Sequence, residues 1–138
     1  MELTRRQTLI VGLGAAAAAV LPLRASAAID EYVSAFTGGA AVGEGGITID
    51  APEIAENGNT VPIEVSAPGA VSIAVYAVGN PVPPVATFNF GPLAASQTAS
   101  TRIRLAKTQD VVAIAKMADG SFVQTSATVK VTIGGCGG

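Results

Sequence analysis

The sequence predicts an all-β fold, and three observations support that prediction. Val, Ile, Ala, Thr and Gly dominate the second half of the 138-residue chain, a composition that favours strands over helices. Apolar residues there alternate with more polar ones, so each expected strand has one face suited to a core. Turn residues such as Pro68-Gly69 and Asp119-Gly120 separate the alternating runs. The length suits one domain.

The apolar periodicity before residue 47 is helical. Four apolar residues fall at i, i+3, i+4 and i+7: Ile29, Tyr32, Val33 and Phe36. This spacing places them on one face of a short helix. Asp30-Glu31 suits the start of that helix, and Gly38-Gly39 suits its end. We expect the apolar face to pack on the chain's own domain, and residues 39–46 to form a flexible link that completes a segment 28–46.

About seven strands are expected in the domain that follows, residues 47–133. They lie near residues 46–50, 60–66, 70–78, 84–90, 99–106, 110–117 and 121–133. Pro68-Gly69 is short enough to make a hairpin, and Asp119-Gly120 is a strong hairpin signal. Short antiparallel strands at regular spacing predict an immunoglobulin-like β-sandwich. A small barrel is the alternative, and the absence of Trp and of a cysteine pair argues against a true antibody-like domain.

The first 27 residues indicate an export signal. Arg5 and Arg6 precede an apolar run of about 15 residues, which is shorter than the roughly 20 that a membrane-spanning helix needs. Small residues at 25–27 suit a signal peptidase, so we expect cleavage after Ala27 and no permanent membrane anchor. Residues 4–9 are similar to a twin-arginine signal, and an ordinary secretory signal is the alternative. Either route leads beyond the inner membrane, and we expect the periplasm.

The residue inventory excludes several classes of function. The chain has no histidine, which removes Ser-His-Asp and Cys-His catalysis and imidazole-based metal sites. Its net charge is −2 with no basic stripe, so nucleic-acid binding has little support. The single cysteine, Cys136, excludes an internal disulfide and a paired-cysteine redox motif. We therefore expect no bound metal and no cofactor.

The cysteine lies in the run Gly134-Gly135-Cys136-Gly137-Gly138, directly after the last expected strand. Glycine lacks Cβ and resists fixed structure, so we expect residues 134–138 to be a flexible arm. Three residues separate Ile133 from Cys136, which gives about 10 Å at full extension. The arm contains no cation or base that would activate the thiol. These features favour a group that is carried to other enzymes over a catalytic cysteine.

Two other functions stay open from the residues alone. An exported sandwich could dimerise through a Cys136 disulfide and act as a binding or structural module. A freestanding thiol enzyme is the weaker alternative, because the arm lacks a base, an oxyanion site and a resolving cysteine.

Four segments resemble the SoxY family, the sulfur-carrier subunits of the periplasmic thiosulfate-oxidising Sox system. They are PEIAENGNTVP at 52–62, GNP at 79–81 with VATF at 85–88, STRIRLAKTQ at 100–109, and VTIGGCGG at 131–138. The resemblance covers roughly residues 29–138. It implies an immunoglobulin-like sandwich that forms a heterodimer with a second small sandwich protein, SoxZ.

The resemblance also implies a reaction cycle on Cys136, in which this chain is the carrier and other proteins are the enzymes. A haem-containing enzyme would couple thiosulfate to the thiol, and a manganese-dependent hydrolase would release sulfate. A sulfane dehydrogenase would oxidise the sulfur that remains. None of those active sites is expected in this chain.

Overall fold

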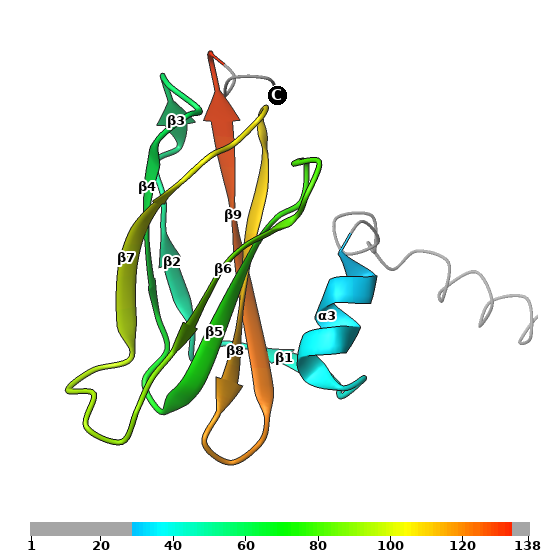
Figure 1. Cartoon of the computed structure of the whole chain (residues 1–138), viewed down its shortest axis with the longest axis vertical. Coiled ribbons are helices and arrows are strands. Elements are labelled where there is room, and N and C mark those ends of the chain that lie inside the picture. Colours follow the sequence, from blue (N-terminus) through cyan, green and yellow to red (C-terminus); the bar gives the residue numbers. More distant parts are fainter. Residues whose placement is uncertain (1–28, 134–138) are drawn as a thin grey trace, which may run out of the picture.

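Strands make up about half of the chain that the structure describes. The computed structural model describes residues 29–133, so the expected signal at 1–27 and the expected arm at 134–138 lie outside it. Within this range the chain forms one helix and nine strands in two sheets (Figure 1). The helix is α3 (Asp30–Thr37), and the strands are β1 (Val42–Glu44), β2 (Thr48–Asp50), β3 (Ile54–Ala55), β4 (Val61–Ser66), β5 (Ala70–Ala77), β6 (Pro84–Asn89), β7 (Thr98–Ile103), β8 (Gln109–Met117) and β9 (Phe122–Val131).

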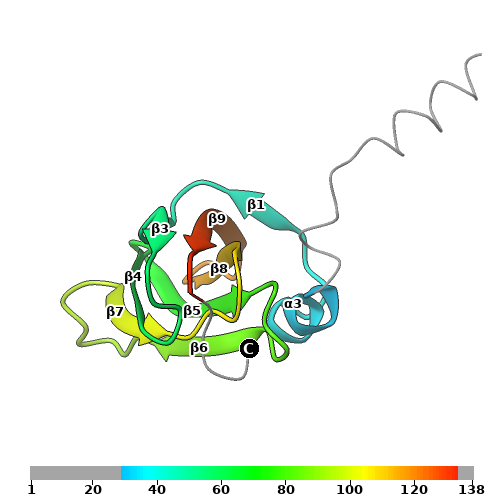
Figure 2. The same cartoon turned by 90° about the horizontal axis from the view of Figure 1, so that it is seen from above.

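The two sheets face each other as an open sandwich, which confirms the predicted fold class over the barrel alternative. The larger sheet has the order β1-β9-β8-β5-β6, with β3 as a further partner of β9, and the smaller has the order β2-β4-β7. The pairings of β1 and β3 with β9 are parallel, and the others are antiparallel. Figure 2 shows β4 and β7 on one side of the larger sheet and α3 on the other.

One of the two expected hairpins forms. Asp119-Gly120 joins β8 to β9 as an antiparallel pair, with Gly120 at a φ of 88° that favours glycine. Pro68-Gly69 instead connects β4 in the smaller sheet to β5 in the larger sheet, so the hairpin prediction there was wrong. Both edges of β5 are occupied by β6 and β8, which leaves no edge on which β4 could pair.

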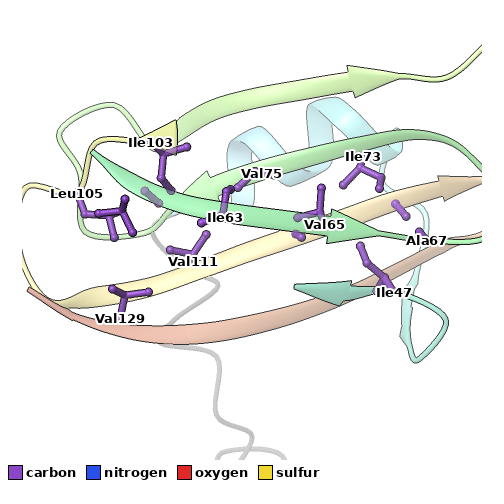
Figure 3. Close-up of a cluster of buried hydrophobic side chains, with 14 of the residues drawn as sticks. Ile47, Ile63, Val65, Ala67, Ile73, Val75, Ile103, Leu105, Val111 and Val129 are labelled. Carbon is purple, nitrogen blue, oxygen red and sulfur yellow. The ribbon is translucent and has the colours of Figure 1, made fainter. Parts of the chain in front are cut away.

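Small aliphatic side chains fill the space between the sheets. Strand β4 buries Val61, Ile63 and Val65 at alternate positions, and the residues between them face solvent. Ile73 and Val75 on β5 belong to the same buried cluster (Figure 3). Burial of one such side chain stabilises the fold by about 1.5–3 kcal/mol, so alternation along a few strands suffices to build this core.

Helix α3 covers the outer face of the larger sheet with three of the four residues expected on its apolar face, and the fourth, Tyr32, is 38% exposed. Ile29, Val33 and Phe36 pack there on a second apolar cluster. The Phe36 ring meets the Phe122 ring of β9 edge to face, with 5.8 Å between ring centroids. Gly38 ends the helix in the left-handed conformation, with a φ of 67°.

Strand β5 departs from the expected pattern of one apolar and one polar face. Ala74 and Tyr76, on the face predicted to be more polar, are buried in the cluster that α3 covers. Val71, at a position expected to face the core, is 39% exposed. Ala74 and Tyr76 are buried because β5 is a central strand with a covered outer face, which its local alternation does not reveal. Val71 lies where the register of β5 with β8 shifts, between Ala70 and Ser72, and such an irregularity re-aims a side chain.

All seven expected strands are present, as β2 and β4 to β9, and two short strands add to them. Strand β1 lies within residues 39–46, the range expected as a flexible link, and pairs with the start of β9. Strand β3 pairs with the end of β9. The last strand ends at Val131 rather than Ile133, but backbone hydrogen bonds continue beyond it.

Candidate functional site

The residues singled out from the sequence for function lie outside the described range. These are Arg5 and Arg6 in the expected signal, and Cys136 with Gly134, Gly135, Gly137 and Gly138 in the expected arm. Within residues 29–133, no helix is long and apolar enough to cross a membrane. The same range contains no group of three His, Cys, Asp or Glu residues placed to hold a metal ion.

The end of β9 leads directly to the cysteine-bearing segment and forms the base of the candidate site. We call residues 131–133 the arm root. The register between β8 and β9 stops at the pair Gln109 and Val129, so the arm root has no partner on β8. Two other segments form hydrogen bonds with the end of β9 instead. They are residues 53–58 on one edge and the loop 104–109 on the other. Figure 1 shows β3, the end of β9 and the β7–β8 connection together at one end of the sandwich.

Backbone hydrogen bonds tie one edge of the arm root to β3 and the turn after it. The Thr132 N–H donates to the Ala55 carbonyl at 3.0 Å, which extends the parallel β3–β9 pairing by one residue. The Gly58 N–H donates to the Ile133 carbonyl at 2.9 Å. The backbone therefore stays paired up to the last described residue.

The Thr108 side chain holds the other edge. Its hydroxyl oxygen accepts a hydrogen bond from the Val131 N–H at 2.9 Å. The hydroxyl also donates to the Val131 carbonyl, with 3.4 Å between the oxygens. A side chain thus replaces the strand partner that β8 no longer provides.

Two side-chain amides give the loop 104–109 its shape. The Asn80 amide nitrogen donates to the Arg104 carbonyl at 2.7 Å. Gln109 is 8% exposed, and its side-chain oxygen accepts from the Gly79 N–H at 2.8 Å. Its amide nitrogen donates to Asn80 Oδ1 at 2.8 Å and to the Lys107 carbonyl at 2.9 Å. Both polar atoms of this buried side chain therefore have partners, as buried polar groups require.

The two edges of the arm root are joined through Gly58. The N–H of Leu105, a fully buried residue, donates to the Gly58 carbonyl at 2.7 Å. Gly58 in turn donates its N–H to Ile133. The loop 104–109 thus holds the arm root directly through Thr108 and indirectly through Leu105 and Gly58.

The resolved pKa shifts of the described residues lie away from the arm root. Burial under α3 raises the pKa of Tyr76. At the β8–β9 hairpin, the Ser121 hydroxyl and then the Ser121 N–H hold the pKa of Asp119 below its usual value. This hairpin lies at the opposite end of the sandwich from the arm root (Figure 1). Both shifts follow from local structure and do not mark an activated acid or base beside residues 131–133.

Two surface pockets lie elsewhere on the described part of the chain. One of about 510 Å³ lies between α3, β1 and the larger sheet, and Ile29, Glu44 and Gln124 are among its lining residues. The other, of about 620 Å³, lies on the smaller sheet beside Glu64 and Arg102. No lining residue of either pocket belongs to the arm root or to the loop 104–109.

Comparison with known proteins places the chain in a family. The sequence model of the family described as "Sulfur oxidation protein SoxY" matches residues 33–136, which is most of the chain. The chain belongs to the SoxY family. The structure of the sulfur carrier protein SoxY from Chlorobium limicola f thiosulfatophilum is 36% identical, with a TM-score of 0.69 over 78% of this chain and 99% of that one. The SoxY resemblance predicted from the sequence is confirmed.

More distant structures share the fold alone. Superoxide reductase (neelaredoxin) from Ignicoccus hospitalis is 21% identical, with a TM-score of 0.55 over 63% of this chain and 80% of that one. A hypothetical protein from Pyrococcus horikoshii OT3 is 15% identical, with a TM-score of 0.53 over 64% of this chain and 96% of that one. No curated protein sequence matches the chain significantly.

The SoxY-like segments of the sequence converge on the arm root. Residues 52–62 contain Gly58, residues 79–81 contain Asn80, and residues 100–109 contain Thr108 and Gln109. Sequence reasoning did not single out these four residues as part of a site. The available signal was their place inside the SoxY-like segments. Nothing in local periodicity shows that two of these segments contact the end of the last strand and that the third, through Asn80, braces one of the two.

Proposed function

We propose that this SoxY-family chain is a thiosulfate-oxidation carrier that holds sulfur intermediates covalently on Cys136. One observation carries the proposal: the family match runs through residue 136, which is the single cysteine of the chain. The Chlorobium relative is itself described as a sulfur carrier protein. A carrier needs one attachment group, and the thiol of Cys136 can form sulfur–sulfur bonds directly.

The proposed chemistry begins when the Cys136 thiol and thiosulfate form a sulfur–sulfur bond. One proton is released, and two electrons pass to a haem-containing partner enzyme. Water then attacks the terminal sulfonate on a manganese-dependent hydrolase, which releases sulfate and a proton and leaves a persulfide on Cys136. A sulfane dehydrogenase then oxidises the outer persulfide sulfur to a sulfonate, with oxygen from water and with the electrons and protons passing to that enzyme and to solvent. A second hydrolysis releases this sulfonate as sulfate and restores the Cys136 thiol. In this scheme the chain is a substrate of these enzymes and not an enzyme itself.

The geometry of the arm root supports a tethered carrier. Because the backbone is hydrogen-bonded up to Ile133, the three residues to Cys136 give a reach of about 10 Å. A covalent tether keeps an intermediate at high effective concentration beside each docked enzyme. The glycines on both sides of Cys136 bring no side chain that would obstruct a narrow cleft.

We further propose that the chain acts in the periplasm as a heterodimer with a SoxZ-like subunit. The Arg5-Arg6 pair, the apolar run and the small residues up to Ala27 support export and cleavage. N-terminal sequencing of the exported protein should begin at Ala28. A mature protein that retains Arg5 would contradict this processing, and purification as a monomer from cells that make SoxZ would contradict the heterodimer.

Intact mass spectrometry tests the carrier function. The wild-type chain incubated with thiosulfate and the coupling enzyme should gain an adduct that a reductant removes, and Cys136→Ser should gain none. An adduct of equal yield on Cys136→Ser would refute the proposal. The alternative, a module that works as a Cys136 disulfide dimer, predicts that reduction to monomer abolishes function. The carrier proposal predicts that the dimer is inactive and that reduction restores loading.

A further inference from the structure

The arm root is held more firmly than the end of a strand requires. Terminal residues of a strand ordinarily fray unless contacts tie them down. Here the Val131 N–H bonds to Thr108, the Thr132 N–H bonds to Ala55, and the Ile133 carbonyl accepts from Gly58. These contacts lie beyond the last register pair of β8 with β9, so the arm root depends on the loop 104–109 at its β8 edge and on β3 and the turn after it at its other edge.

Thr108 is the side chain that closes the exposed edge of the arm root. It lies in an exposed position, where water could satisfy both its hydroxyl and the Val131 backbone. Its bonds to Val131 therefore fix a direction for the chain and do not rescue a buried polar group. The loop that presents Thr108 is itself braced by the bonds of Asn80 and Gln109.

Gly58 holds the opposite edge of the arm root, next to β3, by donating its N–H to the Ile133 carbonyl. Its turn is shaped by the Asn57 side-chain oxygen, which accepts from the Asn59 N–H at 3.0 Å. The Gly58 carbonyl is bonded to Leu105, which is fully buried, so the turn is anchored to the core on the same side as Thr108. The arm root is therefore enclosed between two braced loops.

We propose that Thr108 and Gly58 are positioning residues that fix Ile133 as the pivot of the segment that carries Cys136. The inference rests on the proposed carrier function. With the pivot at Ile133, three residues separate it from Cys136, whereas release of residues 131–133 would move the pivot to Lys130 and make the tether six residues long. Because effective concentration falls roughly as the −3/2 power of tether length, doubling the tether lowers it about threefold. Thr108 and Gly58 thus keep the tether from Ile133 to Cys136 short and fix the direction of the backbone at its start.

Thr108→Val tests the pivot, because valine keeps the shape of threonine and removes the hydroxyl. Thr108→Ser restores a hydroxyl, and Thr128→Val is the matched control, since the Thr128 hydroxyl bonds to Asp110 Oδ1 at 2.6 Å rather than to the arm root. Three measurements compare these variants with the wild type: hydrogen exchange of the Val131 and Thr132 amides, paramagnetic broadening from a nitroxide attached to Cys136, and loading with thiosulfate by the coupling enzyme. Reaction of the thiol with tetrathionate, which displaces thiosulfate and needs no enzyme, is the chemical reference.

Thr108→Val should speed hydrogen exchange of the Val131 amide about tenfold, which is the effect of one lost hydrogen bond. The nitroxide on Cys136 should then broaden NMR signals over a wider part of the sandwich surface. The kcat/KM of Thr108→Val for enzymatic loading should fall by up to about threefold, the value for complete release, because the bonds of Thr132 and Ile133 remain; tetrathionate reactivity should be unchanged. Thr108→Ser and Thr128→Val should resemble the wild type. Two results would overturn the assignment of Ile133 as the pivot. One is a pattern of nitroxide-broadened signals in Thr108→Val that matches the wild type. The other is a wider pattern with enzymatic loading as fast as in the wild type. Absence of a thiosulfate adduct on the wild type would instead refute the proposed carrier function, and the broadening would then decide the pivot by itself.

Discussion

Replacing Gln109 with glutamate tests the buried amide that braces the loop 104–109. The change keeps the oxygen that accepts from the Gly79 N–H and removes the nitrogen that donates to Asn80 Oδ1 and the Lys107 carbonyl. Each lost bond contributes about 0.5–1.5 kcal/mol, and a carboxylate that faces two acceptor oxygens adds to the loss. We expect Gln109→Glu to lower the free energy of unfolding at neutral pH by about 3 kcal/mol.

The loss should depend on pH with a definite sign. Burial and the two facing oxygens raise the folded-state pKa of the introduced carboxyl above its unfolded value of about 4.3. The folded state then binds the proton more tightly than the unfolded state does. The loss of stability is therefore complete above the folded-state pKa and shrinks as the pH falls through it towards the unfolded value. The Lys107 side chain lies beside Gln109 and Gly79, so its positive charge opposes this pKa shift, and Lys107→Met in the same background should enlarge the loss at neutral pH.

Gln97 provides the matched control for this experiment. Its side-chain oxygen accepts from the Gly69 N–H at 3.2 Å, as Gln109 accepts from Gly79, but it is less buried. Gln97→Glu keeps that oxygen and should change the free energy of unfolding by less than about 0.5 kcal/mol. Urea unfolding of both variants at neutral pH and in mild acid measures the difference. Equal losses in the two variants, or a Gln109→Glu loss that grows on acidification, would refute the role assigned to the amide nitrogen.

Two further predictions concern the core and the hairpin. Ile73→Ala should lower the free energy of unfolding by about 2–5 kcal/mol, because Ile73 is fully buried, whereas Val71→Ala on the same strand, 39% exposed, should lose less than about 1 kcal/mol in the same urea series. Equal losses at the two positions would contradict the assignment of the core. Ser121→Ala should raise the pKa of Asp119 towards its usual value, because the Ser121 hydroxyl donates to Asp119 Oδ1 at 2.6 Å. A carbon-detected NMR titration measures this, and an unchanged midpoint would contradict the hydrogen-bond assignment. In the wild type the depressed pKa means that the stabilising contribution of Asp119 is present above its unfolded-state pKa and is lost as the pH falls through the folded-state value.

Alternation in the sequence was enough to predict the strands but not their partners. The period of two in residues such as Val61, Ile63 and Val65 depends on one buried face, which local sequence reports directly. Which strand pairs with which depends on sheet order, and the Pro68-Gly69 connection shows that a short turn can join two sheets. The covered outer face of β5 escaped prediction for the same reason, since it depends on where α3 packs.

The candidate site was predictable in part. A lone cysteine among glycines is visible in the sequence and predicts Cys136 as the attachment site, and this stays a prediction because residue 136 lies outside the described range. Thr108 and Gly58 carry no such signal, because an exposed threonine and a turn glycine are common. Their part in the site comes from contacts with residues 131–133 that are distant in sequence, and periodicity contains no information about such contacts.

The parallel pairing of β3 with the end of β9 has a consequence for biogenesis. The bond between Thr132 and Ala55 joins residues 77 positions apart, so forming it before the intervening strands pair would cost the closure entropy of a long loop. A chain whose sandwich is incomplete lacks these partners for residues 131–133, whereas a complete one holds them in place. Under the proposed carrier function, a partner enzyme that recognises the closed sandwich would therefore load finished copies and pass over unfinished ones.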